Sequence, residues 1–411
     1  MGRKDISFYI LKQVVADLGQ EFFTKDVSED QRLRKAHFDL IDHSQFHAFV
    51  GGALSDYDVS LEIKRIGYHS KRGSIWRKTG LSTQATGCII HRSSPSTSIS
   101  IPLQKEEERS TNQFGLGPQY AQDNVLARRM RKHQSWYRSE VLNLPYGTGP
   151  GPNDTSAYGN MLTRSDGEAG RNFLSPEIFE VVQNRISQGG GAVEKYRLLH
   201  NMLSSQPMCF NLFGPLVRDQ ELARTLLEEL VPEKISEVIR VSIEWSPKPA
   251  SDYLNDNTAF DAFIEYRTTD GRLFGLGIET KLSEPFSQKE YDKPEYRRWM
   301  HGSDVPWLPE SWSKVQTIEH NQLWREHLMA VSMRNRSGSV YDHVRLMLVH
   351  HPADIECARY FSNYKKLLKD DDDSLISFSL DQIVDSWLSV VNSGDQLFWL
   401  KSFNNRYVDL E

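Results

Sequence analysis

The C-terminal third of the chain alternates helical and β-favouring segments, and the order of these segments constrains the fold more than any other feature. In chain order they are a helix over 219–230, strands over 238–245, 259–267 and 273–282, a helix over 315–331 and a strand over 344–350. The strands are rich in β-branched and apolar residues, whereas the helices repeat apolar residues every three to four positions. A last strand over 375–378 precedes a helix that opens with Ser379-x-x-Gln382, which has the form of a capping box. The order predicts an α/β (α+β) fold with a central mixed β-sheet, in which an antiparallel meander is extended by a crossover helix and a buried strand.

Acidic and basic residues stand at the ends of two of these strands. Asp261 lies in the apolar sequence Thr258-Ala-Phe-Asp-Ala-Phe-Ile, and Glu279 and Lys281 end the segment Gly277-Ile-Glu-Thr-Lys. A carboxylate buried there without a partner would be costly. The pattern therefore indicates a compensating metal ion or ammonium group.

Strand register decides whether the two carboxylates can meet. Facing residues of an antiparallel hairpin have a constant index sum, and Asp261 with Glu279 centres the turn on residue 270. A three-residue loop Thr269-Asp270-Gly271, with left-handed Gly271, has that centre. Lys281, two residues further, shares the face of Glu279, so we expect all three side chains on one side of the sheet.

Two carboxylates so placed suit a hard cation such as Mg²⁺, for which Mn²⁺ can substitute, with the main-chain carbonyl of Thr280 as a further oxygen ligand. Glu244, near the end of the preceding strand, could reach the same edge as another ligand. Such an ion orients and activates water for attack on a phosphodiester, and Lys281 would either help to position and deprotonate that water or stabilise the transition state. The alternative is a surface hairpin with an ordinary Glu–Lys pair, because Asp-x17-Glu-x-Lys alone recurs by chance.

The strand order and the motif together resemble the PD-(D/E)XK superfamily, which includes many restriction endonucleases. More narrowly, three segments look like a little-described bacterial restriction-endonuclease-like family, and a fourth looks like that family's downstream helix motif. They are Asn201-Met-Leu-Ser-Ser-Gln-Pro-Met-Cys-Phe-Asn-Leu-Phe-Gly214, Thr258-Ala-Phe-Asp261, Gly277-Ile-Glu-Thr-Lys281 and Asn321-Gln-Leu-Trp-Arg325. The likeness covers about residues 122 to 400. Phe260 stands where the superfamily's motif has proline, and residues 1–120 have no recognised counterpart, which leaves the determinant of target choice open.

The resemblance implies Mg²⁺-dependent hydrolysis of DNA by an endonuclease with a restriction or defence role, in which Asp261 and Glu279 bind the metal and Lys281 is the catalytic lysine. RNA is not excluded as a substrate. Cutting both strands of a duplex would favour a homodimer, because each active site handles one strand. The rival hypothesis is a non-catalytic DNA-binding or scaffold subunit that uses a nuclease-like fold.

Two groups of polar residues are candidates for nucleic-acid contacts. A basic segment over 122–141 carries Arg128, Arg129, Arg131 and Lys132, and phosphate contacts are made by such residues. Gln322 and Arg325 lie on one side of the predicted crossover helix, where related nucleases contact a phosphate or the attacking water. A solvated helix surface is the alternative for both groups. Ser204, Ser205 and Gln206 either line the cleft or cap the chain before Pro207.

Composition sets the broad class. The chain has 411 residues, a net charge of −6 and 38% hydrophobic residues, as in soluble globular proteins. Its three scattered cysteines form neither a disulfide framework nor a zinc site, and no segment has the pattern of a signal peptide or membrane helix, so we expect a cytoplasmic protein. The stretch from Ser93 to Pro118 is rich in Ser, Thr, Pro and Gly, which predicts a linker or an exposed loop. We divide the chain into an N-terminal α+β domain over 1–92, a linker over 93–120, a mostly helical segment over 121–215 and the sheet-containing core over 216–411. Within the mostly helical segment we expect a long irregular loop near 145–159.

Overall fold

The computed structural model describes residues 114–189, 193–302 and 304–410, and the backbone of three strands nearer the N-terminus. The chain divides into two compact units, residues 1–110 and 111–411. In the first unit, strands β1 (Glu21–Phe23), β2 (Ile63–His69) and β3 (Gly73–Lys78) form an antiparallel sheet in the order β1-β3-β2. The rest of the predicted N-terminal domain, and most of the predicted linker, lie outside the described residues.

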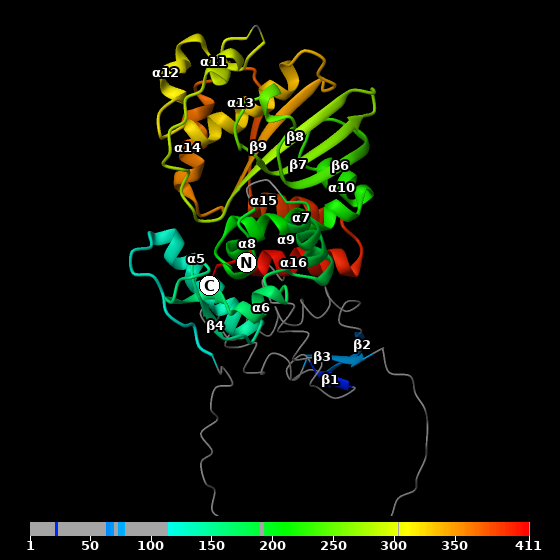
Figure 1. Cartoon of the computed structure of the whole chain (residues 1–411). Coiled ribbons are helices and arrows are strands. Elements are labelled where there is room, and N and C mark those ends of the chain that lie inside the picture. The colour runs from blue at the N-terminus through cyan, green and yellow to red at the C-terminus, as the bar shows by residue number, and fades with distance from the viewer. Residues whose placement is uncertain are drawn as a thin grey trace, which may run out of the picture. The chain divides into compact units, whose positions relative to one another are not determined.

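A five-stranded mixed sheet forms the centre of the second unit (Figure 1). Its strands are β6 (Ile235–Trp245), β7 (Phe260–Thr268), β8 (Leu273–Lys281), β9 (His343–His350) and β10 (Leu375–Ser379), in the spatial order β10-β9-β8-β7-β6. The pairs β6–β7 and β7–β8 are antiparallel, whereas β8–β9 and β9–β10 are parallel. The predicted meander, crossover and buried strand are thus confirmed.

The β7–β8 hairpin has the predicted register. Ala262 faces Ile278, and the same index sum holds along the ladder to Arg267 and Leu273. At the turn the Thr268 amide donates to the Arg272 carbonyl at 3.0 Å, which encloses the three-residue loop, and Gly271 has φ +88°. The pairing ends at Ala262 and Ile278, and one further step in this register would set Asp261 opposite Glu279.

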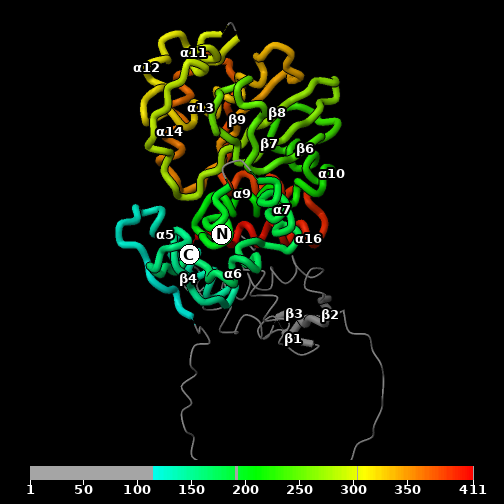
Figure 2. Tube along the Cα trace, viewed as in Figure 1, coloured from blue at the N-terminus to red at the C-terminus, as the bar shows by residue number. Residues whose placement is uncertain are grey.

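Helices cover both faces of the sheet. On one face lie α7 (Pro176–Ser187), α9 (Ser205–Arg218), α10 (Gln220–Leu227), α15 (Leu380–Val390) and α16 (Gly394–Tyr407), which share a core with residues such as Ile264 and Ile278. On the other lie α11 (Pro294–Met300), α12 (Trp312–Val315), α13 (Asn321–Asn335) and α14 (Ile355–Lys365), packed with Phe260 and Phe263. The Ser379 capping box of α15 is present as predicted. Figure 2 shows α16 beside α9, so the C-terminal helix closes the layer formed much earlier in the chain.

The segment before the sheet contains α5 (Val125–Trp136), a π-helical turn over Tyr137–Val141, α6 (Arg164–Glu168) and α8 (Lys195–His200). The prediction of a long irregular loop near 145–159 is wrong, because β4 (Tyr146–Thr148) and β5 (Ala157–Leu162) form an antiparallel hairpin there. Gly147 makes this pairing possible, since a Cβ atom at this position would lie 2.1 Å from the Leu162 carbonyl oxygen. No helix of the described residues has the length and apolar character needed to cross a membrane.

Candidate active site

Asp261 is anchored where the regular pairing of β7 and β8 ends. Its Oδ2 accepts hydrogen bonds from the Thr280 amide at 2.8 Å and from the Thr280 hydroxyl at 2.7 Å. The half-buried carboxylate therefore replaces a main-chain acceptor at the end of the ladder. These two bonds fix it beside the segment that carries Glu279 and Lys281.

Glu279 and Lys281 form a buried ion pair on the face of β8 that α13 covers. The Lys281 ammonium lies 2.8 Å from Glu279 Oε1, and the two side chains are 9% and 6% exposed. The same Glu279 oxygen accepts a hydrogen bond from Gln322 Nε2 at 2.7 Å. Because the Ser287 amide donates to Gln322 Oε1 at 2.7 Å, the orientation of that amide group is fixed. Glu279 Oε1 is thus held by two donors from different elements.

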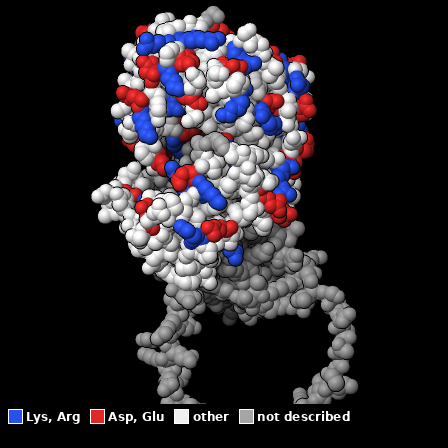
Figure 3. Space-filling model, in the orientation of Figure 1, with Lys and Arg blue, Asp and Glu red and all other residues white. Residues whose placement is uncertain are grey.

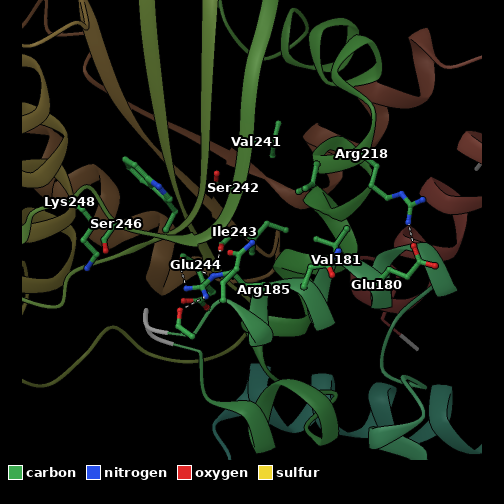
Figure 4. Close-up of a pocket in the computed structure, with 15 residues that line it drawn as sticks. Glu180, Val181, Arg185, Arg218, Val241, Ser242, Ile243, Glu244, Ser246 and Lys248 are labelled. Atoms are coloured by element: carbon green, nitrogen blue, oxygen red, sulfur yellow. Dashed lines mark hydrogen bonds and ion pairs between the residues drawn. The ribbon is translucent and has the colours of Figure 1, made fainter.

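Glu244 enters the site from the end of β6. It has a left-handed backbone (φ +53°), and its carbonyl accepts a hydrogen bond from Arg185 of α7 at 2.7 Å. Its buried carboxylate accepts a hydrogen bond from Gln206 Nε2 at 2.5 Å. Glu244 and Arg185 line a cavity of about 710 Å³ between α7 and the end of β6 (Figure 4). Gln206 thus reaches the site through its bond to Glu244, and Ser204 caps α9 by accepting a hydrogen bond from the Gln206 main-chain amide at 3.2 Å.

Four carboxyl groups share this region with one lysine. Burial and the charge of Glu326 raise the pKa of Glu279 to about 8, and burial and Glu279 raise that of Asp261 to about 7. Burial likewise raises the pKa values of Glu244 and Glu326 to about 7, with Asp261 adding to the effect on both. Burial alone would lower the pKa of Lys281, but the charges of Glu279 and Glu326 raise it above its ordinary value. The cluster has more buried negative charge than Lys281 can balance.

These residues fit a hard divalent cation. Carboxylate and carbonyl oxygens are the ligands that such ions prefer, and the excess of carboxyl groups is the electrostatic condition that a bound cation would relieve. No three His, Cys, Asp or Glu side chains of the described residues are placed to hold one ion together. A site here would therefore use at most two of these side chains, completed by main-chain carbonyl oxygen and water.

The predicted nucleic-acid contacts fall into two classes. Arg131 is bound within the protein, where it donates to Asp123 at 2.5 and 3.0 Å and to Asn160 at 2.5 Å. Arg325 likewise donates to Thr258 at 2.6 Å and stacks on Tyr291, with 4.3 Å from guanidinium carbon to ring centroid.

The remaining basic side chains of α5, those of Arg128, Arg129 and Lys132, are exposed. On the face of the second unit that Figure 3 shows, basic and acidic side chains are interspersed. The charge pattern of this face does not mark out a single basic surface.

Sequence reasoning missed one site residue. Glu326, on α13, is 5% exposed and accepts a hydrogen bond from Gln322 Nε2 at 3.0 Å. It follows Gln322 by four positions, which places both on one side of a helix. Both positions also lie within the helix predicted over 315–331, so that spacing could have revealed Glu326.

Comparison with known proteins agrees with this geometry. No curated protein and no solved structure matches the chain. A family model described as the PD-(D/E)XK nuclease superfamily matches residues 121–409, which include the whole five-stranded sheet and every residue of the site. The chain belongs to the PD-(D/E)XK nuclease superfamily.

Proposed function

We propose that the protein is a Mg²⁺-dependent endonuclease that hydrolyses DNA phosphodiester bonds, with Asp261, Glu279 and Lys281 as its catalytic centre. The observation that carries the proposal is the cluster of buried carboxyl groups around one ammonium group at the end of β7 and β8. The setting we propose is restriction or defence, in the cytoplasm, by a homodimer when both strands are cut.

Asp261, Glu279 and the Thr280 carbonyl would hold the cation, whereas Glu244, which the sequence offered as another ligand, would add negative charge beside it. When bound, Mg²⁺, or Mn²⁺ in its place, activates a water and neutralises charge on the phosphate. Thr280 fixes one oxygen of Asp261, and Lys281 and Gln322 together fix Glu279 Oε1. The second oxygen of each carboxylate is the one we expect to face the ion.

Lys281 serves as a cation rather than as a base. Because Glu279 and Glu326 favour its protonated form, it can stabilise the negative charge that develops on the phosphoryl oxygens. Its 4.9 Å contact with the ring of Phe286 helps to hold the ammonium group in place. Exposed Arg128, Arg129 and Lys132 would contact phosphates, while Arg131 and Arg325 would support the elements that carry those contacts.

The test is cleavage of plasmid DNA by the full chain with Mg²⁺, with Ca²⁺ and with chelator. We expect Lys281→Ala and Asp261→Ala to abolish cutting, and Glu237→Gln, an exposed carboxylate at the far end of β6, to leave it intact. Cutting that persists in either catalytic variant would remove that residue from the mechanism. RNA of the same sequence, assayed in parallel, decides the substrate class.

The rival function is a non-catalytic DNA-binding subunit with a nuclease-like fold. It predicts that the wild-type chain binds DNA without cutting it, and that Lys281→Ala leaves its affinity unchanged. The buried Lys281–Glu279 pair favours the enzyme, because a scaffold has no need for an acid-rich buried cluster that costs stability.

A further inference from the structure

Glu326 has no role in the proposed mechanism, yet one of its oxygens is unsatisfied. Oε1 accepts the hydrogen bond from Gln322, whereas Oε2 is buried and has no hydrogen-bond partner among the described residues. A buried carboxylate oxygen without a donor is costly, and such groups are rare in native proteins. The oxygen therefore indicates a ligand that the protein itself does not provide.

The surroundings of Glu326 place it at the catalytic cluster. Lys281 and Arg325 attract its carboxylate, and Asp261 repels it. Among the charged groups that act on the pKa of Glu279, Glu326 has the largest effect. None of the nearby side-chain donors makes a hydrogen bond to Oε2: the Gln322 amide binds Glu279 and Glu326 Oε1, and the Lys281 ammonium pairs with Glu279. Oε2 therefore remains available to a group bound beside the cluster.

Glu326 does not complete the inner shell of the cation. No three acidic, His or Cys side chains of the described part of the chain are placed to hold one ion, so Glu326 does not join Asp261 and Glu279 as a third direct ligand. Mg²⁺ keeps several of its waters when it binds to one or two carboxylates. A carboxylate beyond direct reach can accept hydrogen bonds from those waters, and such outer contacts tune metal affinity.

We propose that Glu326 is an outer-sphere ligand of the divalent cation, whose Oε2 accepts a hydrogen bond from metal-bound water. This inference rests on the proposed function. Through Gln322, the same side chain positions Glu279 Oε1, so α13 both fixes the inner carboxylate of Glu279 on β8 and supplies an outer acceptor. Glu326 is thus a positioning residue.

The experiment measures Mn²⁺ binding to the full chain by isothermal titration calorimetry and by the electron paramagnetic resonance signal of free Mn²⁺. Glu326→Gln keeps a carbonyl oxygen for the Gln322 bond but replaces the free carboxylate oxygen with an amide donor. We expect its Mn²⁺ affinity to fall roughly tenfold or more, as for other outer-shell substitutions. Glu319→Gln, an exposed carboxylate just before α13, is the matched control and should bind as the wild type does.

The outcomes separate this inference from the proposed function. If the wild type binds no Mn²⁺, the cation site and the proposed function fail together. If the wild type binds Mn²⁺ and Glu326→Gln binds it equally well, the outer-sphere role is overturned while the nuclease proposal stands. Should Glu326→Gln not fold, Glu326→Asp, whose shorter side chain withdraws the acceptor, is titrated instead, and unchanged affinity would again overturn the role.

Discussion

Replacing Asp261 with asparagine should stabilise the cation-free protein while abolishing its activity. Asparagine keeps an oxygen that can accept both Thr280 hydrogen bonds, but it removes a charge that is unfavourable in this cluster. Burial and the charge of Glu279 raise the pKa of Asp261 from 3.8 to about 7. The folded state therefore binds this proton more tightly than the unfolded chain does.

The sign and the size of the effect follow from linkage. A carboxyl group with a raised pKa in the folded state contributes stability that is complete below pH 3.8 and is lost as the pH rises through about 7. Each tenfold change in proton affinity is worth about 1.4 kcal/mol. If Asp261 were fully buried, the rise of its pKa from 3.8 to about 7 would lower the free energy of unfolding by about 4 kcal/mol above pH 7. Because Asp261 is half-buried, solvent screens part of this, and we expect Asp261→Asn to gain about 2–3 kcal/mol at pH 8.

Urea denaturation in chelator, followed by tryptophan fluorescence, measures this difference. Eight of the nine tryptophans lie in residues 111–411, with Trp76 as the exception, so the signal reports the unit that contains the site. The gain should be near zero at pH 4, grow through pH 7 and level off. Adding Mg²⁺ should stabilise only the wild type, because a ligand that binds the native state raises its stability. A variant no more stable than the wild type at pH 8, or a gain independent of pH, would refute the reasoning.

Two further predictions concern the surrounding structure. Gly277→Ala should destabilise the protein by about 1–3 kcal/mol in urea denaturation, because the new Cβ would lie 2.4 Å from the buried ring of Phe260; full stability would show that this strand end tolerates more crowding than we infer. Arg131→Ala should likewise lower the free energy of unfolding by about 1–3 kcal/mol, because it removes the bonds to Asp123. Lys132→Ala should leave stability unchanged. It should instead reduce the slope of DNA affinity against salt concentration, measured by fluorescence anisotropy, by the equivalent of about one phosphate contact. Equal effects of the two substitutions on DNA binding would contradict that division of roles.

The hairpin that carries Asp261 and Glu279 could be predicted because its register depends on local information. Loop length and one glycine, Gly271, determine which residues face each other, and both can be identified from the sequence. The β4–β5 hairpin was missed because its glycines and prolines are typical of a loop, and only the close approach of Leu162 to Gly147 explains them. Most of helix α9 lies in the segment predicted to be mostly helical, but the sequence did not define it as a separate helix because Pro215 lies within it.

The contacts that complete the site depend on long-range packing as well as on local pattern. Gln206 and Glu326 come from helices on opposite faces of the sheet, and each meets the strand ends only after both layers have packed. Local patterns therefore located the inner carboxylates, whereas the outer partners required the assembled fold.

The same packing explains how the buried carboxyl groups are held in place without each being paired with a basic side chain. Each carboxyl group accepts a hydrogen bond from an uncharged side chain: Thr280 for Asp261, Gln206 for Glu244, and Gln322 for both Glu279 and Glu326. These donors are neutral, so they fix the oxygens without cancelling their charge, as an arginine in the same position would. Lys281 supplies the only ion pair within this set of described residues, and the negative charge it leaves unbalanced gives the site its affinity for a cation. A site that lowered its folding cost by pairing every carboxylate would have lost the electrostatic basis for binding metal.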